Sequence, residues 1–501
     1  MHGLLHRTAG LMLGAAALAL GAVPALAQSA TPTIEAVPGK PTLMLANYDL
    51  AELGYQVSEA FLSGTATSYT LPGAPTADGV WNASPAATAP FKTRVVVVRP
   101  SDPARFNGTV LVEWLNVTAG QDAAADWMIA HREMIRKGYA YVGVTAQKVG
   151  IDGGGIMGQG SALRKADAAR YGSLSHPGDA WSYDIYSQVG RALKSAGSGG
   201  LLGSLAPRRV IAIGESQSAA FLTTYVNAVD RLARVYDGFF VHSRFGSASS
   251  LSGVPMGGGE GGAAVMPPHV RFRPDLRVPV LTVITETDLA GARLSGYHGS
   301  RRRDDARLRV WEVAGTAHAD SYMFGGAFID SGKQGSAVLA KVFQASKQGP
   351  MGAEAVALNP GMPHHYVTQA ALAALESWVR TGRAPASTRP MQLAPGGKDG
   401  EPALVRNAQG IAQGGVRTPW TDVPTVRLSG KGDPKSFIGM LAGSGEPLTR
   451  AELATLYPGG KAEYLRRFTA ALDAAIRAGH VLRDDRQEIL EIAAINFDAA
   501  P

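Results

Sequence analysis

Short runs of apolar, β-branched residues recur through the middle of the chain and alternate with longer segments of helical character. Continuous apolar runs of this kind are typical of strands buried on both faces, and the intervening helices favour a mainly parallel sheet covered on both sides. The expected strands are residues 95–98, 109–115, 139–144, 210–213, 238–241, 280–284 and 309–313, and the expected helices are 123–137, 183–194, 219–232 and 369–380.

The segments on either side of this pattern differ from it. Residues 28–90 are rich in Pro, Gly, Ala and Thr and predict an N-terminal lead-in of strands and loops. Residues 91–380 form the expected core, and residues 381–501 a C-terminal extension that ends in a helix-rich tail at 450–492. We interpret residues 28–501 as a single domain, since α/β enzymes often reach this length as one unit.

The N-terminus has the pattern of a secretory signal peptide. An apolar run at 11–20 follows Arg7, and Ala25-Leu26-Ala27 supplies a small-x-small cleavage site before Gln28. We therefore expect residues 1–27 to be removed and the product to be periplasmic or extracellular. No later apolar stretch approaches the roughly 20 residues of a spanning helix, so no stable membrane insertion is expected.

Composition excludes several kinds of chemistry. The chain has no cysteine, which rules out disulfides, thiolate metal sites and a cysteine nucleophile. The formal charge of +7 comes from basic residues scattered among acids, which argues against a nucleic-acid partner. The glycine-rich segments 150–160 and 256–262 lack a Gly-Lys-Ser/Thr ending, and no His-Glu-x-x-His spacing occurs. We expect no metal and no cofactor.

The strongest chemical signal is a serine at a strand-to-helix junction. The strand at 210–213 runs through Gly214-Glu215-Ser216-Gln217-Ser218 directly into a helix, which is the context of a nucleophile elbow. That turn is tight, so the positions two before and two after the nucleophile must be small, as Gly214 and Ser218 are. We predict Ser216 as the nucleophile; the alternative is a serine that caps an ordinary helix.

A serine nucleophile needs a base and an acid farther along the chain. His318 ends a loop of small residues after the last expected strand, whereas its rival His365 has no strand before it. The acid should follow the strand at 280–284, where Glu286 and Asp288 both qualify; we prefer Asp288 for its place in the turn. The order nucleophile, acid, histidine is that of the α/β-hydrolase fold.

An oxyanion site would complete this machinery. The backbone amide of Gln217, at the start of the helix after Ser216, is the expected first donor. The second should come from the loop after the strand at 109–115, where either the Asn116 side chain or the Val117 amide could serve. An ordinary strand-end turn explains that loop nearly as well.

Further short motifs join those already described, so that the set covers residues 61–66, 112–117, 170–179, 182–185, 214–218, 285–288, 314–318 and 415–420. On these motifs the chain resembles the bacterial secreted proteins known as alpha/beta hydrolase domain-containing proteins. The resemblance implies one hydrolase unit that includes the tail, with the segment around Arg417 and Trp420 packed onto the core.

These observations predict a secreted serine hydrolase that cleaves a small carboxylic ester through an acyl-enzyme on Ser216. An amide, lactone or polyester substrate is the alternative within the same chemistry. A non-catalytic binding protein that keeps the fold is the alternative outside it, although such a protein is expected to lose at least one of Ser216, His318 and the acid. Nothing in the sequence indicates an oligomeric state.

Overall fold

The computed structural model describes residues 31–501 apart from 156–157, 159, 196–199, 254–265, 292–293 and 397–400. The expected signal peptide at 1–27 and the glycine-rich segment at 256–262 lie outside the described residues.

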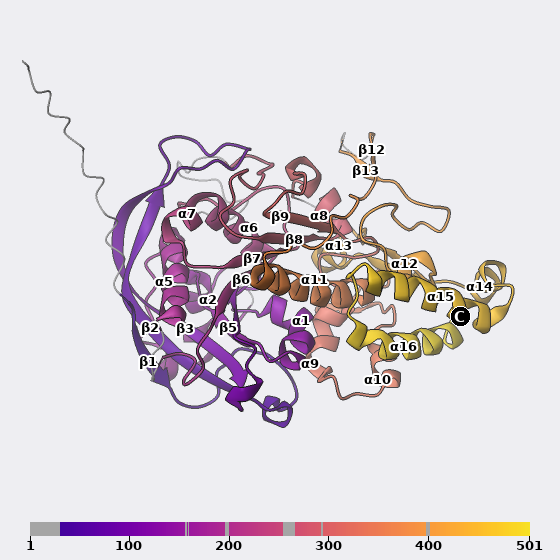
Figure 1. Cartoon of the computed structure of the whole chain (residues 1–501), viewed down its shortest axis with the longest axis horizontal. Helices are drawn as coiled ribbons and strands as arrows, with labels where there is room; N and C mark the ends of the chain where they lie inside the picture. Colours follow the sequence, from indigo (N-terminus) through magenta and orange to yellow (C-terminus); the bar gives the residue numbers. More distant parts are fainter. Residues whose placement is uncertain are drawn as a thin grey trace, which may run out of the picture.

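A nine-stranded sheet forms the centre of the molecule, in the order β1-β2-β3-β5-β4-β6-β7-β8-β9 (Figure 1). The strands from β5 to β9 along this order run parallel, and β1, β2 and β3 add antiparallel pairs at one edge. The predicted mainly parallel sheet is confirmed. The strands are β1 Thr33–Val37, β2 Tyr55–Thr70, β3 Ser84–Pro100, β4 Thr109–Trp114, β5 Ala140–Val144, β6 Arg209–Glu215, β7 Gly238–His242, β8 Val280–Ile284 and β9 Leu308–Glu312.

Helices cover both faces of this sheet, because alternate side chains of each central strand point to opposite sides and most of them are apolar on either side. In β4, Val112 and Trp114 pack on one face with α5 and α6, while Leu111 packs on the other face with α1 and α11. The helices are α1 Ala125–Arg136, α2 Lys148–Asp152, α3 Leu163–Ala166, α4 Ala168–Tyr171, α5 Ser182–Lys194, α6 Gln217–Thr224, α7 Asp230–Ala233, α8 Glu286–Ala290, α9 Ala327–Ile329, α10 Ser336–Val342, α11 Met362–Thr381, α12 Pro419–Asp422, α13 Phe437–Ala442, α14 Arg450–Leu456, α15 Gly460–Arg477 and α16 Arg486–Asp498.

A π-helical turn at Tyr225–Val229 joins α6 to α7. Among the described residues, none of the helices combines the length and apolarity that crossing a bilayer requires.

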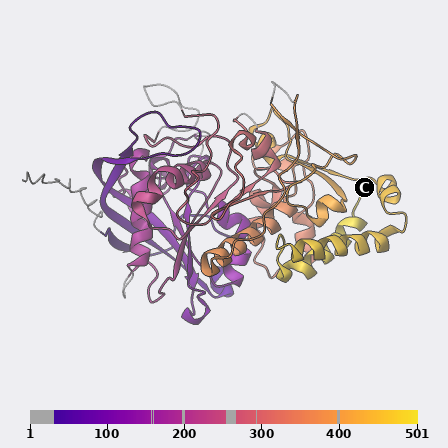
Figure 2. The same cartoon turned by 45° about the horizontal axis from the view of Figure 1, so that its top comes forward.

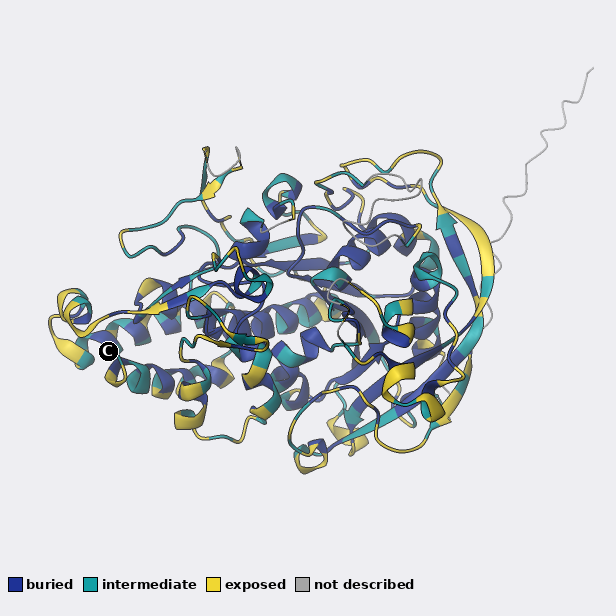
Figure 3. Ribbon diagram, turned by 180° about the vertical axis from the view of Figure 1, so that it is seen from behind, coloured by how far each residue is buried: buried dark blue, intermediate teal, exposed yellow. Residues whose placement is uncertain are grey.

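The lead-in and the core share one sheet. β3 begins at Ser84 and continues past residue 90, the expected boundary, into the buried run Val95–Val98. Its first half and the facing part of β2 form a long hairpin that packs its inner face on α5 and leaves its outer surface exposed (Figure 3). Alternation of small and polar residues over this half explains why its strand character is weak in the sequence.

The C-terminal extension packs beside the sheet through a hydrophobic cluster of its own (Figure 2). Trp420 stacks on Tyr366 of α11 with ring centroids 5.4 Å apart, and Phe468 of α15 meets its edge. A bidentate ion pair from Arg132 of α1 to Glu488 of α16, at 2.7 and 2.9 Å, ties the tail to the core. In the described part of the chain, three two-stranded antiparallel sheets lie in or near this half: β10 Gln348–Gly349 with β11 Gly352–Ala353, β12 Leu393–Ala394 with β13 Ala403–Leu404, and β14 Val426–Ser429 with β15 Ser444–Pro447.

Replacing Phe468 by alanine tests whether the tail is an integral part of the fold. Phe468 is fully buried, so Phe468→Ala should lower the free energy of unfolding by about 3–5 kcal/mol. Urea unfolding followed by tryptophan fluorescence measures this loss. Arg466→Ala, an exposed change on the same helix, should stay within about 0.5 kcal/mol of wild type. Equal stability of the two variants would contradict the integral packing of the tail.

Candidate active site

Ser216 occupies the sharp turn between β6 and α6 with φ 60° and ψ −118°, a conformation that costs a non-glycine residue about 1–3 kcal/mol. A Cβ on Gly214 would lie 2.9 Å from Leu222 of α6 and 3.2 Å from the Cβ of Ser218. The small residues expected at 214 and 218 therefore allow strand and helix to approach. The turn places the hydroxyl at the carboxyl end of the central strand.

His318 and Asp288 meet Ser216 in one continuous line of hydrogen bonds. Ser216 Oγ lies 2.7 Å from His318 Nε2, and His318 Nδ1 lies 2.6 Å from Asp288 Oδ1. The geometry lets His318 donate its Nδ1–H to Asp288 and accept a hydrogen bond from the Ser216 hydroxyl at Nε2. The ring of Phe245 packs against the imidazole, with centroids 4.9 Å apart.

Asp288 is fully buried but favours its ionised form. Burial acts to raise its pKa, yet the charge and hydrogen bond of His318 and the hydrogen bonds of Thr285 outweigh burial and leave the pKa below its ordinary value. The backbone amide of Thr285 donates to Asp288 Oδ2 at 2.8 Å, and the two residues cap α8 reciprocally. The same carboxylate thus starts the helix and orients the imidazole.

Glu286, the other acid considered, is engaged elsewhere. Its Oε1 accepts from the amide of Gly315 at 2.7 Å, and its Oε2 accepts from the amide of Gly430 at 3.0 Å and from Arg406 at 2.8 Å. The C-terminal extension approaches so closely that a Cβ on Gly430 would lie 2.5 Å from the Glu286 Cβ. Glu286 braces the loop before His318 against the extension.

His365 lies inside α11, away from Ser216. Its Nδ1 bonds the carbonyl of Ile129 at 2.8 Å, its Nε2 lies 3.0 Å from the Gln369 amide nitrogen, and its ring packs on Tyr322. Burial lowers its pKa well below the ordinary value. These contacts join α11 to α1 and to the segment after His318.

The three expected oxyanion donors differ in their surroundings. Gln217 is the first residue of α6, and its side chain donates to Gln147 Oε1 at 2.7 Å. The Asn116 side chain donates to the carbonyl and carboxyl oxygens of Glu215 at 3.3 and 3.4 Å, and its Oδ1 accepts from the Thr118 amide. Asn116 is thus occupied with bracing its loop against β6. Val117 is buried in the turn that Gly120 closes on its carbonyl.

Glu215 is a site residue that sequence reasoning missed. Its carboxyl is buried beside Ser216, with Oε1 3.6 Å from His318 Nε2. Burial raises its pKa well above the ordinary value, and the nearby acids Asp126, Asp288 and Glu113 raise it further. The sequence does carry a signal for it. Glu215 is the variable residue of the Gly-x-Ser motif, at the end of a strand expected to be buried, and a carboxylate is rarely buried in such a place.

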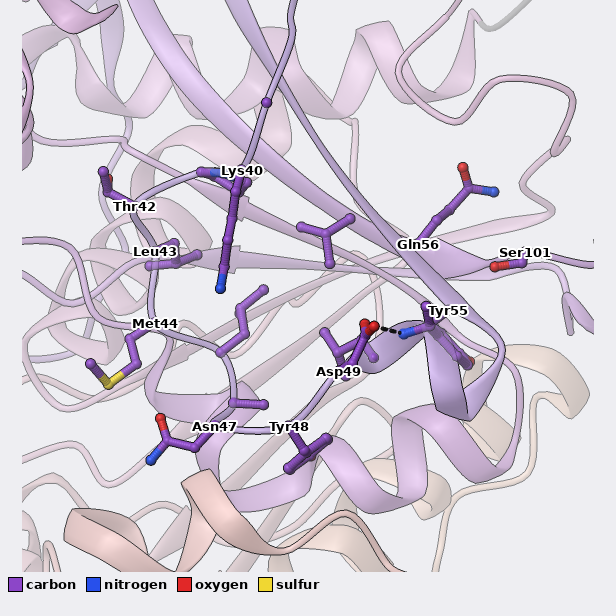
Figure 4. A pocket seen from close by; sticks show the side chains of 17 residues that line it. Lys40, Thr42, Leu43, Met44, Asn47, Tyr48, Asp49, Tyr55, Gln56 and Ser101 are labelled. Carbon is purple, nitrogen blue, oxygen red and sulfur yellow. Dashed lines mark hydrogen bonds between the residues drawn. The ribbon is translucent and has the colours of Figure 1, made fainter.

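Metal sites and pockets were the other candidates for a functional site. No group of three or more metal-ligating side chains occurs in the part of the chain that the structure describes. A pocket of about 1050 Å³ is lined by residues of the segment 39–57 and by Ser101, with Lys40 reaching into it (Figure 4). None of the expected site residues lines it.

Replacing Glu286 by glutamine tests the brace. The variant leaves at least one buried backbone amide facing an NH₂ group, so Glu286→Gln should cost roughly 1–3 kcal/mol of unfolding free energy. Chemical denaturation is the measurement. Glu35→Gln, which removes an exposed ion pair with Lys92, is the control and should cost less than about 1 kcal/mol. A Glu286 variant as stable as this control would show that the brace contributes nothing.

Comparison with known proteins assigns the chain to a family. In solved structures the chain is similar to acetyl xylan esterase 1 from Thermoanaerobacterium sp. JW/SL YS485, with 9% identity, 56% of this chain and 81% of that one covered, and a TM-score of 0.27. It is also similar to an esterase from Pyrococcus furiosus, with 9% identity, coverage of 54% and 87%, and a TM-score of 0.27. The sequence has no significant match among curated proteins. A family described as alpha/beta hydrolase domain matches residues 22–491, and the chain belongs to this family.

Proposed function

We propose that this protein is a serine esterase in which Ser216 attacks the carbonyl of a small carboxylic ester. The observation that carries the proposal is the line of hydrogen bonds from Ser216 Oγ through His318 to Asp288, at 2.7 and 2.6 Å. Membership of the alpha/beta hydrolase family supports it, because that fold uses this order of nucleophile, acid and histidine.

In the proposed reaction, His318 Nε2 takes the hydroxyl proton as Ser216 Oγ bonds the carbonyl carbon. The tetrahedral intermediate then expels the alcohol, which receives that proton from His318, and an acyl-enzyme remains. His318 then deprotonates a water molecule, which bonds the acyl carbon. The second tetrahedral intermediate expels Ser216 Oγ, which receives the proton back from His318, and the acid is released. Asp288 keeps its negative charge throughout and stabilises the imidazolium.

We assign the oxyanion to the backbone amides of Gln217 and Val117. The amide of Gln217 begins a helix, where N–H groups have no intrahelical partner and the helix dipole favours negative charge. For the second donor, the Val117 amide is preferred over the Asn116 side chain, whose nitrogen already donates to Glu215. Two preorganised amides would favour the intermediate over the planar ester.

Ester hydrolysis is tested with short and medium acyl p-nitrophenyl esters and a fluorophosphonate probe. The wild type should turn over the esters and become labelled, whereas Ser216→Ala should take no label and lose on the order of 10⁴–10⁶-fold in kcat. Asp288→Asn should remain folded and lose on the order of 10⁴-fold, because the amide imposes the wrong imidazole tautomer. Full activity in Ser216→Ala would contradict the assignment of Ser216 as nucleophile. A wild type that neither takes the probe nor hydrolyses the esters would favour a non-catalytic binding protein.

We also propose that residues 1–27 direct export and are removed, on the pattern of their sequence alone. The expected mature chain begins near Gln28. N-terminal sequencing of the protein recovered from the periplasm or the medium of a bacterial host measures this directly. An intact Met1 on protein that stays in the cytoplasm would contradict export.

A further inference from the structure

Four buried side chains form a single hydrogen-bonded chain next to the candidate site. Asp126 Oδ1 lies 2.8 Å from His242 Nδ1, His242 Nε2 lies 2.8 Å from His364 Nε2, and His364 Nδ1 lies 2.8 Å from Asp320 Oδ2. None of the four is more than 1% exposed. They come from α1, the end of β7, the first turn of α11 and the segment just after His318.

The number of protons in this chain follows from its geometry. Each of its three contacts is a hydrogen bond only if one proton lies between the two atoms, so the chain holds three protons. Two carboxyl groups and two imidazoles with three protons among them carry a net charge of −1. Since the two Nε2 atoms face each other, one imidazole must donate to the other.

The two ends of the chain have different surroundings, and this difference locates the charge. Asp320 also accepts the amide of Met323 at 2.9 Å, so its carboxylate has two donors. Asp126 Oδ2 is buried and has no partner among the described residues, which disfavours an ionised Asp126. Burial also raises the pKa of Asp126 well above its ordinary value and lowers that of His242 well below. The protons therefore point from Asp126 toward an ionised Asp320.

Ser216 and His318 both attach to this chain through short segments of backbone. Asp320 is two residues beyond His318, and the carbonyl of His242 accepts the amide of Ser216 at 3.0 Å. On its other side, the His318 backbone is held by the amide of His318 donating to Thr287 Oγ1 at 3.2 Å. The segment that carries His318 is thus fixed before and after the imidazole.

We propose that His364 is a positioning residue that holds the His318 segment in its reactive place through Asp320. The proposal rests on the proposed esterase function, since the placement of His318 is measured through the rate of ester hydrolysis. Buried ionised groups tolerate only the arrangement that satisfies them, so the chain restricts the segment to one geometry. A displaced His318 should therefore lower kcat, while substrate binding should change little.

Two substitutions of His364 separate its two contacts. In His364→Asn the amide nitrogen can take the place of Nδ1 and keep the bond to Asp320, while the contact with His242 is lost. In His364→Gln the longer amide can take the place of Nε2 and accept from His242, while the bond to Asp320 is lost. Each variant gives up one buried hydrogen bond, so the two should unfold at similar temperatures.

Steady-state hydrolysis of p-nitrophenyl acetate should then distinguish the variants. We expect His364→Gln to lose on the order of 10- to 100-fold in kcat with little change in KM, and His364→Asn to stay close to wild type. Asp320→Asn keeps the side-chain volume and should lower kcat as His364→Gln does. It replaces His364→Gln in this test if His364→Gln does not fold. Equal kcat values in folded His364→Asn and His364→Gln, or losses confined to KM, would overturn the positioning role.

Proton NMR of the wild type gives a readout independent of turnover. The imidazole N–H protons of the chain should resonate far downfield of the amides, and His364→Gln should remove the resonance of the proton shared with Asp320. If the wild type shows this resonance but hydrolyses no ester and takes no fluorophosphonate, the esterase function fails and the positioning role fails with it. If the wild type is active and the resonance is lacking, the proposed chain of protons is wrong while the esterase function stands.

Discussion

A carboxylate that stays ionised although it is fully buried is the constraint on which the candidate site depends. Asp288 meets this constraint because His318 and the amide of Thr285 supply partners that compensate for lost hydration. A pKa lowered by folding means that this contribution to stability is present above the ordinary aspartate pKa and is lost as the pH falls through the lowered value. The neighbouring acid Glu215 has no comparable set of donors, and burial raises its pKa instead. Two carboxyl groups beside His318, Asp288 at 2.6 Å and Glu215 at 3.6 Å, thus have pKa values that their surroundings shift in opposite directions.

Most of the sheet and the line from Ser216 to Asp288 could be predicted because each depends on local sequence. A strand buried on both faces needs a continuous apolar run, and a nucleophile at a strand-to-helix turn needs small residues around it. The strand at 280–284 was predicted to the residue, and the acid and base follow the strands after which they were expected. The long β2–β3 hairpin was underestimated because its outer half is exposed and built of small and polar residues.

What could not be predicted arises from contacts between segments far apart in the chain. His242, His364, Asp126 and Asp320 have no spacing in common, since each belongs to a different element and only the packing of α11 across the sheet brings them together. The role of Glu286 was open for the same reason. Its partners Arg406 and Gly430 follow it by more than a hundred residues, so the choice between Glu286 and Asp288 could be argued only from turn geometry.

The brace between Glu286 and Gly430 has a consequence for the order in which the working enzyme is made. Ribosomes complete Ser216, Asp288 and His318 well before Gly430 and before Leu441, whose carbonyl accepts the amide of Ala319. A nascent chain that ends after His318 therefore carries all three residues of the proposed triad but lacks the contacts that fix the loops of Asp288 and His318. On the proposed function, the candidate site is complete only once the residues around Gly430 and Leu441 have been made and have packed.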